Sequence, residues 1–191
     1  MGASDMKRFF IAVNFLMVTL STSMVEGKDG ESVADLGLLY QMKFGVLAHD
    51  VDDLWSGFSR EDGVDLNIEA VFSPAISILG GTIRPALGGS INTEGDTSKG
   101  YLDLLWQYNF TTGFFLVTGV GAAIHDGRRH ATTPAKKALG SRVLFHIPLE
   151  VGYFISPRTT FSIYFDHMSN AYIADENEGM DTLGARFGYV F

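Results

Sequence analysis

The chain has no cysteine and only five prolines among its 191 residues. The lack of cysteine excludes a disulfide framework, a thiolate nucleophile and a cysteine-ligated zinc site. Basic side chains are outnumbered by acidic ones, and the net charge of −8 argues against a nucleic acid partner. Glycine is plentiful at 22 residues, and aromatic side chains make up 13%. This balance favours many strands joined by tight turns over a helical bundle.

Familiar motifs are missing as well. The sequence contains no nucleotide-binding glycine motif, and after the first two dozen residues it shows no stretch with helical periodicity. It also contains no Gly-x-Ser-x-Gly elbow, so the hydrolase folds built on that turn have no support.

The N-terminal segment has the features of a leader. Lys7 and Arg8 precede an apolar run over residues 9–20, and the small residues 21–23 follow it. A basic region, a short apolar region and small residues predict a secretory signal peptide over residues 1–26. We therefore expect residues 27–191 to form the mature domain. A buried or interfacial helix is the alternative reading of the apolar run.

Eight segments show the alternation of apolar and polar residues that is typical of strands. It is clearest over residues 64–72, where Val64, Leu66 and Ile68 alternate with polar residues. Each segment has about the ten residues that a tilted membrane-spanning strand needs. Within the third segment Pro85 predicts a bulge or a local bend, because proline cannot donate to a ladder. The predicted strands span 38–49, 64–72, 83–92, 102–110, 114–124, 143–153, 161–171 and 181–191.

The connections between these strands alternate in length. Long polar connections at 50–62, 93–98, 125–139 and 170–180 alternate with shorter turns. An even number of strands with long loops at one end predicts an all-β fold, an eight-stranded antiparallel up-and-down transmembrane β-barrel of the bacterial outer membrane. We expect the long loops to lie outside the cell.

In this barrel the apolar stripe of each strand would face lipid, and the other stripe would fill the lumen. A soluble lipid-binding barrel is the alternative, in which the two faces would be reversed. Both charge signs occur among the predicted lumen residues, so internal pairing can offset their desolvation. These residues are Lys43, Asp65, Glu69, Arg84, Asp103, Gln107, His146, Glu150, Asp166 and Arg186.

The end of the chain supports the membrane assignment. Phe187, Tyr189 and Phe191 lie at alternate positions, and the sequence stops on the last aromatic residue. This end resembles the last strand of outer-membrane barrels, which implies the barrel-assembly machinery as a partner during insertion.

The final two strands also carry a set of reactive side chains. His167 and Ser169 lie two residues apart on one face, with Cα atoms roughly 6.5 Å apart. If the strands pair as a hairpin, Asp181 lies near the same loop on the partner strand. A hydroxyl, an imidazole and a carboxylate are the three groups of a hydrolytic triad. The alternative is an ordinary strand in which His167 and Ser169 have only a structural role.

Two motifs of this hairpin resemble the lipid A 3-O-deacylase (PagL) family. The first is Phe-Asp-His-Met-Ser-Asn-Ala at 165–171, and the second is Asn-Glu-Gly-Met-Asp at 177–181. Outside residues 161–191 the similarity is one of architecture: a leader, eight strands and polar loops. The resemblance implies an outer-membrane esterase that removes the 3-O-linked acyl chain of lipid A, with lipopolysaccharide as its substrate.

The resemblance also assigns roles to individual residues. It implies that Ser169 is the nucleophile, that His167 is the general base and that Asn170 helps to form the oxyanion hole. Asp181 would be the third member of the triad, at a position where a member of the family has glutamate. It implies neither a metal nor a cofactor.

Several questions are open at this level. The third triad member could instead be an acid of the adjacent loop, namely Asp175, Glu176 or Glu178. The basic loop from Arg128 to Lys137 either meets lipid A phosphates or is merely solvated. A non-catalytic small barrel with a structural or adhesive role is the competing function. The sequence does not fix the oligomeric state or the preferred acyl chain.

Overall fold

The computed structural model describes residues 37–130 and 133–191, so the predicted signal peptide at 1–26 lies outside the described residues. The described part forms nine antiparallel strands in one sheet. In chain order the strands are β1 (Leu39–Ala48), β2 (Val64–Phe72), β3 (Ile76–Ile78), β4 (Gly81–Asn92), β5 (Lys99–Asn109), β6 (Phe114–His125), β7 (Val143–Ser156), β8 (Thr159–Ser169) and β9 (Met180–Val190).

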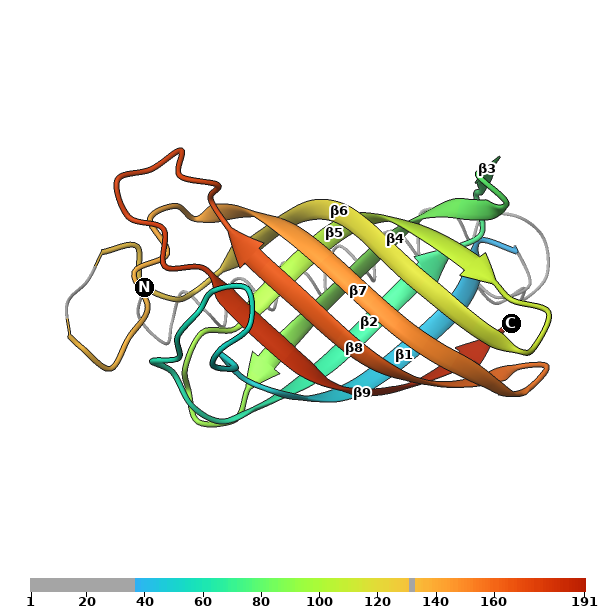
Figure 1. Cartoon of the computed structure of the whole chain (residues 1–191), viewed down its shortest axis with the longest axis horizontal. Coiled ribbons are helices and arrows are strands. Elements are labelled where there is room, and N and C mark those ends of the chain that lie inside the picture. Colours follow the sequence, from blue (N-terminus) through green and yellow to red (C-terminus); the bar gives the residue numbers. More distant parts are fainter. Residues whose placement is uncertain (1–36, 131–132) are drawn as a thin grey trace, which may run out of the picture.

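Eight of these strands close into a ring (Figure 1). The strands lie in the order β2, β1, β9, β8, β7, β6, β5 and β4, and β4 pairs back onto β2. The predicted eight-stranded antiparallel barrel is therefore confirmed. The sequence missed β3, a three-residue strand that pairs with the start of β4 and projects from one end of the barrel.

The two faces of the barrel differ as the alternation predicts. In β7 the side chains of Val143, Phe145 and Leu149 are exposed, whereas the intervening Leu144 and His146 are buried. The other barrel strands repeat this pattern, so the outer surface is a belt of exposed apolar side chains. Such a belt is stable only against an apolar medium, as in a transmembrane barrel. Within the described residues, no helix is long and apolar enough to cross a membrane.

Most of the predicted lumen residues are buried inside the barrel, and Arg84 and Gln107 are half-buried. The Nζ atom of Lys43 lies 3.2 Å from Glu69 and 2.7 Å from Glu150. The guanidinium of Arg186 lies between the same two carboxylates, at 3.4 and 3.6 Å. Because each buried charge has partners of opposite sign, the network offsets the cost of desolvation. The lumen is filled by side chains.

Pro85 is accommodated without the bulge that its presence predicted. The pairing of β4 with β5 continues without a register shift through Pro85 and Leu104. On the other side, the pairing of β4 with β2 ends at Ala86. The ladder between β4 and β2 therefore ends next to Pro85, so it needs no N–H from the proline.

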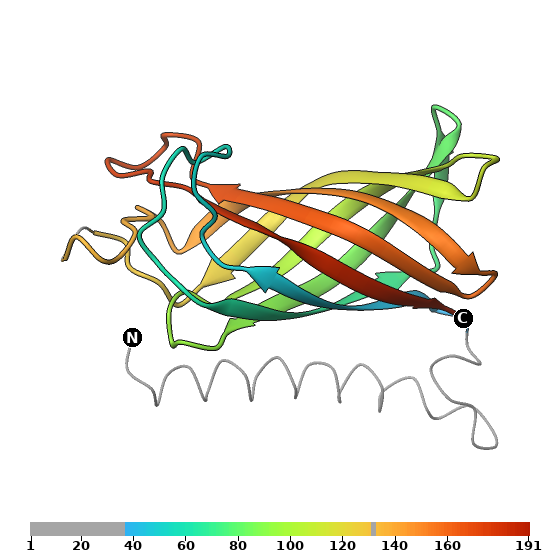
Figure 2. The ribbon, with the colours of Figure 1, turned by 60° about the horizontal axis from the view of Figure 1, so that its bottom comes forward.

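The connections lie at opposite ends of the barrel according to their length. The long ones at 49–63, 93–98, 126–130 with 133–142, and 170–179 gather at one end, and the C-terminus, β3 and the short turns lie at the other (Figures 1 and 2). The long connections are ordered against one another: Arg60 of the first contacts Glu178 of the last at 3.1 Å. The end with the long loops is where the hairpin of β8 and β9 turns.

The orientation of the barrel can be tested by labelling, because the chain has no cysteine of its own. We expect Glu94→Cys and Lys136→Cys, which lie in long loops, to react with a membrane-impermeant maleimide on intact cells. Arg158→Cys, an exposed position in the turn between β7 and β8, is the matched control and should react only after permeabilisation. The opposite pattern would show that the long loops face the periplasm.

Candidate active site

The hairpin of β8 and β9 brings three predicted site residues together. Backbone pairing places His167 directly opposite Asp181. The Nδ1 atom of His167 lies 2.7 Å from the Asp181 carboxylate, and its Nε2 atom lies 2.9 Å from the Ser169 hydroxyl. The carboxylate fixes the tautomer in which Nδ1 carries the proton, so Nε2 is free to accept the proton of the serine. This is the arrangement in which a base can activate a serine hydroxyl.

Asp181 is the acid that hydrogen-bonds His167, and two of the acids of the adjacent loop have partners elsewhere. Glu178 is engaged elsewhere, because its carboxylate accepts the N–H of Ala138 at 2.6 Å and pairs with Arg60. Glu176 lies 3.5 Å from the imidazole of His130 in the neighbouring loop. The hydrogen bond from His167 goes to Asp181.

The first long loop covers this hairpin on its outward face. The ring of Trp55 stacks on the imidazole of His167, with centroids 4.5 Å apart and planes 9° apart. The backbone N–H of Ser56 donates to the second carboxylate oxygen of Asp181 at 2.6 Å. His167 and Asp181 are therefore only 5% and 0% exposed, although they lie on the lipid-facing side of their strands. The sequence analysis identified neither Trp55 nor Ser56 as part of this site.

Lys137 holds this loop in place. Its ammonium lies 3.1 Å from Asp50, donates to the carbonyl of Phe58 at 2.5 Å and lies 4.1 Å from the ring centre of Phe58. The side chain is fully buried, so it is not part of a solvated basic loop. The same side chain reaches Ser56 Oγ at 3.5 Å. The 126–142 connection thereby anchors the loop that contacts Asp181.

Asn170 does not offer a free side-chain donor beside Ser169. Its amide nitrogen donates to the carbonyls of Leu139 and Glu176, at 2.9 and 2.6 Å, which uses both protons. Its backbone N–H donates to Asn177 at 2.8 Å. Asn170 thus joins the 126–142 connection to the turn after β8. The two residues after it have positive φ, 52° at Ala171 and 61° at Tyr172, so the chain turns sharply beside Ser169.

Two glycines make this packing possible. Gly179 has a φ of 54°, and a Cβ there would lie 3.1 Å from the imidazole of His167. Gly140 has a φ of 72°, and a Cβ there would lie 1.9 Å from the carbonyl oxygen of Glu176. The glycine in the second motif of the hairpin is thus needed for its conformation and for the approach of the imidazole.

A pocket of about 380 Å³ opens at the hydroxyl of Ser169. Its walls combine the reactive pair with the turn residues Ala171 and Tyr172, and with Phe145 and Ile147 of β7. Because Phe145 belongs to the exposed apolar belt, the pocket opens sideways onto the lipid-facing surface. Among the described residues, no group of three or more His, Cys, Asp or Glu side chains is placed to hold a metal ion.

The fold and the site together define an outer-membrane β-barrel with a Ser–His–Asp hydrogen-bond chain at its rim. A model of the family described as lipid A 3-O-deacylase (PagL) matches residues 84–190. That range is more than half of the chain, and the chain belongs to this family. The family resemblance seen in the hairpin is therefore confirmed.

Similar proteins agree with this assignment. The lipid A deacylase PagL of Bordetella bronchiseptica is 28% identical over 118 residues, which are 57% of this chain and 62% of that protein. The crystal structure of the outer membrane enzyme PagL has a TM-score of 0.59 at 14% identity, and covers 78% of this chain and 99% of that one. Neisserial surface protein A has a TM-score of 0.50 at 13% identity, with coverages of 80% and 97%. The two structures support the barrel fold.

The contacts of Lys137 predict that it controls the order of the first loop. Lys137→Met keeps the length of the side chain but leaves Asp50 buried without its ion-pair partner, which costs about 3–5 kcal/mol in comparable pairs. We expect residues 50–62 to exchange amide hydrogens faster and to be cut more readily by protease, with the barrel strands unchanged. Lys136→Met, which removes the neighbouring half-buried pair with Asp96, is the control and should leave loop exchange close to that of the parent. Equal protection in both variants would contradict the anchoring role.

Proposed function

We propose that the protein is a serine esterase of the bacterial outer membrane that removes the 3-O-linked acyl chain of lipid A. The observation that carries this proposal is the continuous hydrogen-bond chain from Ser169 through His167 to Asp181 in the wall of a pocket that opens toward lipid. Membership of the PagL family supplies the substrate class. Insertion by the barrel-assembly machinery is part of the proposal, from the aromatic end of β9.

In the first half of the reaction, the Ser169 hydroxyl attacks the ester carbonyl while Nε2 of His167 takes its proton. The Asp181 carboxylate holds the Nδ1 proton and stabilises the imidazolium that forms. The proton then passes to the departing 3-hydroxyl of the sugar, which leaves an acyl-enzyme. In the second half, His167 activates a water that hydrolyses this ester and restores the serine.

The tetrahedral intermediates need hydrogen-bond donors for the oxyanion. Because the side chain and the backbone N–H of Asn170 are already engaged, we assign Asn170 a positioning role. The proposed donor is the backbone N–H of Ala171, which lines the pocket in a left-handed conformation. Asn170 keeps that turn in place through its bonds to Leu139 and Glu176.

The surroundings of the triad fit an acyl substrate in the membrane. Trp55 covers one face of the imidazole and shields it from water, which strengthens its electrostatic interactions. Phe145 and Ile147 provide an apolar wall along which an acyl chain can extend beside the barrel. The lipid therefore approaches the serine without leaving its leaflet.

The nucleophile and the base are tested by Ser169→Ala and His167→Asn. We expect each variant to lose deacylation by about ten-thousand-fold or more, because either change removes the activated nucleophile. Ser59→Ala, which removes an exposed hydroxyl of the first loop, is the control and should retain parental activity. Mass spectrometry of lipid A from cells that express each variant gives the readout. If lipid A from cells with the parent protein keeps its 3-O-linked chain, the protein is a non-catalytic barrel.

The third member of the triad is tested by Asp181→Asn. An asparagine has one acceptor oxygen, so it cannot serve both His167 and the N–H of Ser56. We expect the turnover rate to fall roughly ten- to ten-thousand-fold, with little change in substrate binding. Glu178→Gln is the control from the adjacent loop. Parental activity in Asp181→Asn together with a loss in Glu178→Gln would identify the loop acid as the true partner.

A further inference from the structure

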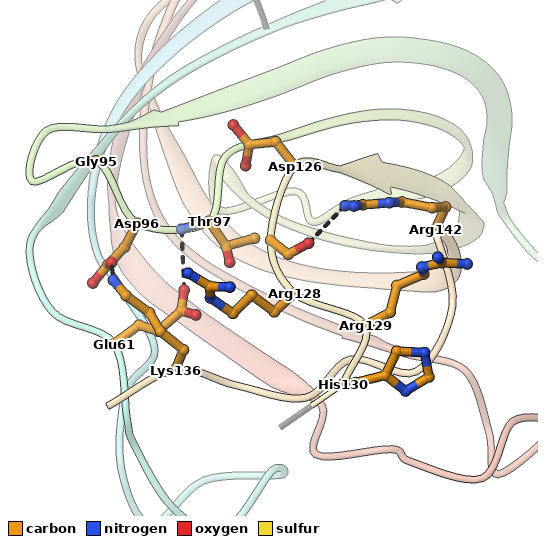
Figure 3. Close-up of a pocket in the computed structure, with 11 residues that line it drawn as sticks. Glu61, Gly95, Asp96, Thr97, Asp126, Arg128, Arg129, His130, Lys136 and Arg142 are labelled. Carbon is orange, nitrogen blue, oxygen red and sulfur yellow. Dashed lines mark hydrogen bonds and ion pairs between the residues drawn. The ribbon is translucent and has the colours of Figure 1, made fainter. Parts of the chain in front are cut away.

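A second pocket, of about 400 Å³, lies among the long loops and shares no residue with the pocket at Ser169 (Figure 3). It is formed by the 93–98 connection, the 126–142 connection and Glu61 of the first loop. Its basic side chains are Arg128, Arg129, His130, Lys136 and Arg142.

The acidic residues of this pocket already have partners. Glu61 contacts His49 at 3.3 Å and accepts the N–H of Thr97 at 3.0 Å. Burial opposes both charges, but hydrogen bonds to acidic neighbours raise the pKa of His49 to about 9, and hydrogen bonds from His49 and Thr97 lower the pKa of Glu61 to about 2. Both groups are therefore charged at neutral pH and compensate each other. Asp96 forms an ion pair with Lys136.

The remaining acid, Asp126, accepts the backbone N–H of Ser98 at 2.7 Å, so it helps to hold the two connections together. None of the three carboxylates of the pocket is paired with an arginine in the part of the chain that the structure describes.

The arginines of the pocket carry charge that this part of the chain does not neutralise. Arg142 donates to the carbonyls of Gly127 and His125, at 2.6 and 3.3 Å, which orients its guanidinium along the pocket wall (Figure 3). Arg128 and Arg129 are exposed. Three guanidinium groups around one hollow repel one another unless an anion lies between them. Their planar forks match the oxygens of a phosphoryl group, to which arginine binds with two parallel hydrogen bonds.

We propose that this pocket binds a phosphoryl group of the lipid A molecule whose ester lies at Ser169. The pocket is joined to the catalytic hairpin by two hydrogen bonds: Leu139 donates to the carbonyl of Arg128 at 2.9 Å, and Asn170 donates to the carbonyl of Leu139 at 2.9 Å. Both pockets lie at the end of the barrel with the long loops. A phosphoryl group on the sugar of lipid A, at the surface of the membrane, reaches the loops while its acyl chains stay in the leaflet.

This proposal rests on the proposed function, and it gives the 126–142 connection a role in substrate binding. The arginines would hold the head of the lipid, and the pocket at Ser169 would hold the ester. Loss of the arginines should therefore weaken binding without slowing the chemical step.

The test compares the parent protein with the double variant Arg128→Ala/Arg129→Ala in non-ionic detergent micelles. Two substrates are used, diphosphorylated lipid A and lipid A from which a phosphatase has removed the phosphates. With the diphosphorylated substrate, we expect the KM of the double variant to rise about tenfold or more at nearly constant kcat, since hydrogen bonds between charged groups are lost. With the dephosphorylated substrate, the two proteins should have equal KM values.

Arg158→Ala is the matched control, because it removes an exposed arginine at the opposite end of the barrel. It should behave as the parent on both substrates. The proposal is overturned if the double variant keeps the parental KM on diphosphorylated lipid A, or if its KM rises equally on the dephosphorylated form.

A further arm separates the substrate's own phosphate from that of a neighbouring lipid. Dephosphorylated substrate is mixed with diphosphorylated lipid A that already lacks its 3-O-linked chain. The two proteins should still have equal KM values. If the added lipid restores the difference between them, the pocket binds a neighbour, and the proposed source of the phosphate is wrong.

Binding measured without turnover separates this proposal from the proposed function. Calorimetric titration of Ser169→Ala with micelles of diphosphorylated lipid A should show tighter binding than the same titration of Ser169→Ala with both arginines also replaced. That difference would support the phosphoryl site even if the parent cleaved neither substrate. Equal binding by the two proteins would overturn the site while leaving the esterase activity untouched.

Discussion

The register between β8 and β9 is the constraint on which the site depends. The outward pair His167 and Asp181 lies next to the inward pair Asp166 and Thr182, whose side chains are hydrogen-bonded at 2.7 Å. Asp166 is also paired with Lys99 across the lumen. A shift of one residue would place Asp181 among the lumen charges and an apolar or neutral residue opposite the imidazole. The polar lumen thus fixes, from inside the barrel, a geometry that is used on the outside.

Much of the barrel was predictable because its signals are local. Alternation over about ten residues identifies a strand and both of its faces, and the lengths of the connections separate the two ends. The relative positions of His167, Ser169 and Asp181 could be predicted because they depend on the pairing within a single hairpin. The short β3 was missed since Ile76–Ile78 is too brief for alternation to be recognised. The bulge expected at Pro85 did not occur, because pairing with β2 ends there instead.

The cover over the site was not predictable, because it depends on contacts between distant parts of the chain. Ser56 and Asp181 are separated by 125 positions, and the contact uses a backbone N–H that leaves no trace in composition. In the sequence Lys137 belongs to a basic loop, yet in the structure it is buried against Asp50 and Phe58, whereas its neighbour Lys136 stays at the rim. Asn170 follows the serine, as in the family motif. Only the structure shows that its side-chain amide holds a turn in place.

The position of the site relative to the chain ends has a consequence for biogenesis. The ring closes where the first strand, β1, pairs with the last, β9. The loop that follows β1 carries Trp55 and Ser56, which contact His167 of β8 and Asp181 of β9. The hairpin of β8 and β9 and the loop that covers it therefore lie on opposite sides of the closing seam. A chain with an open seam lacks the second donor to Asp181 and the shield over His167. Under the proposed function, the esterase would mature only as the barrel closes, so a chain still in transit would be a poor hydrolase toward the lipids it passes.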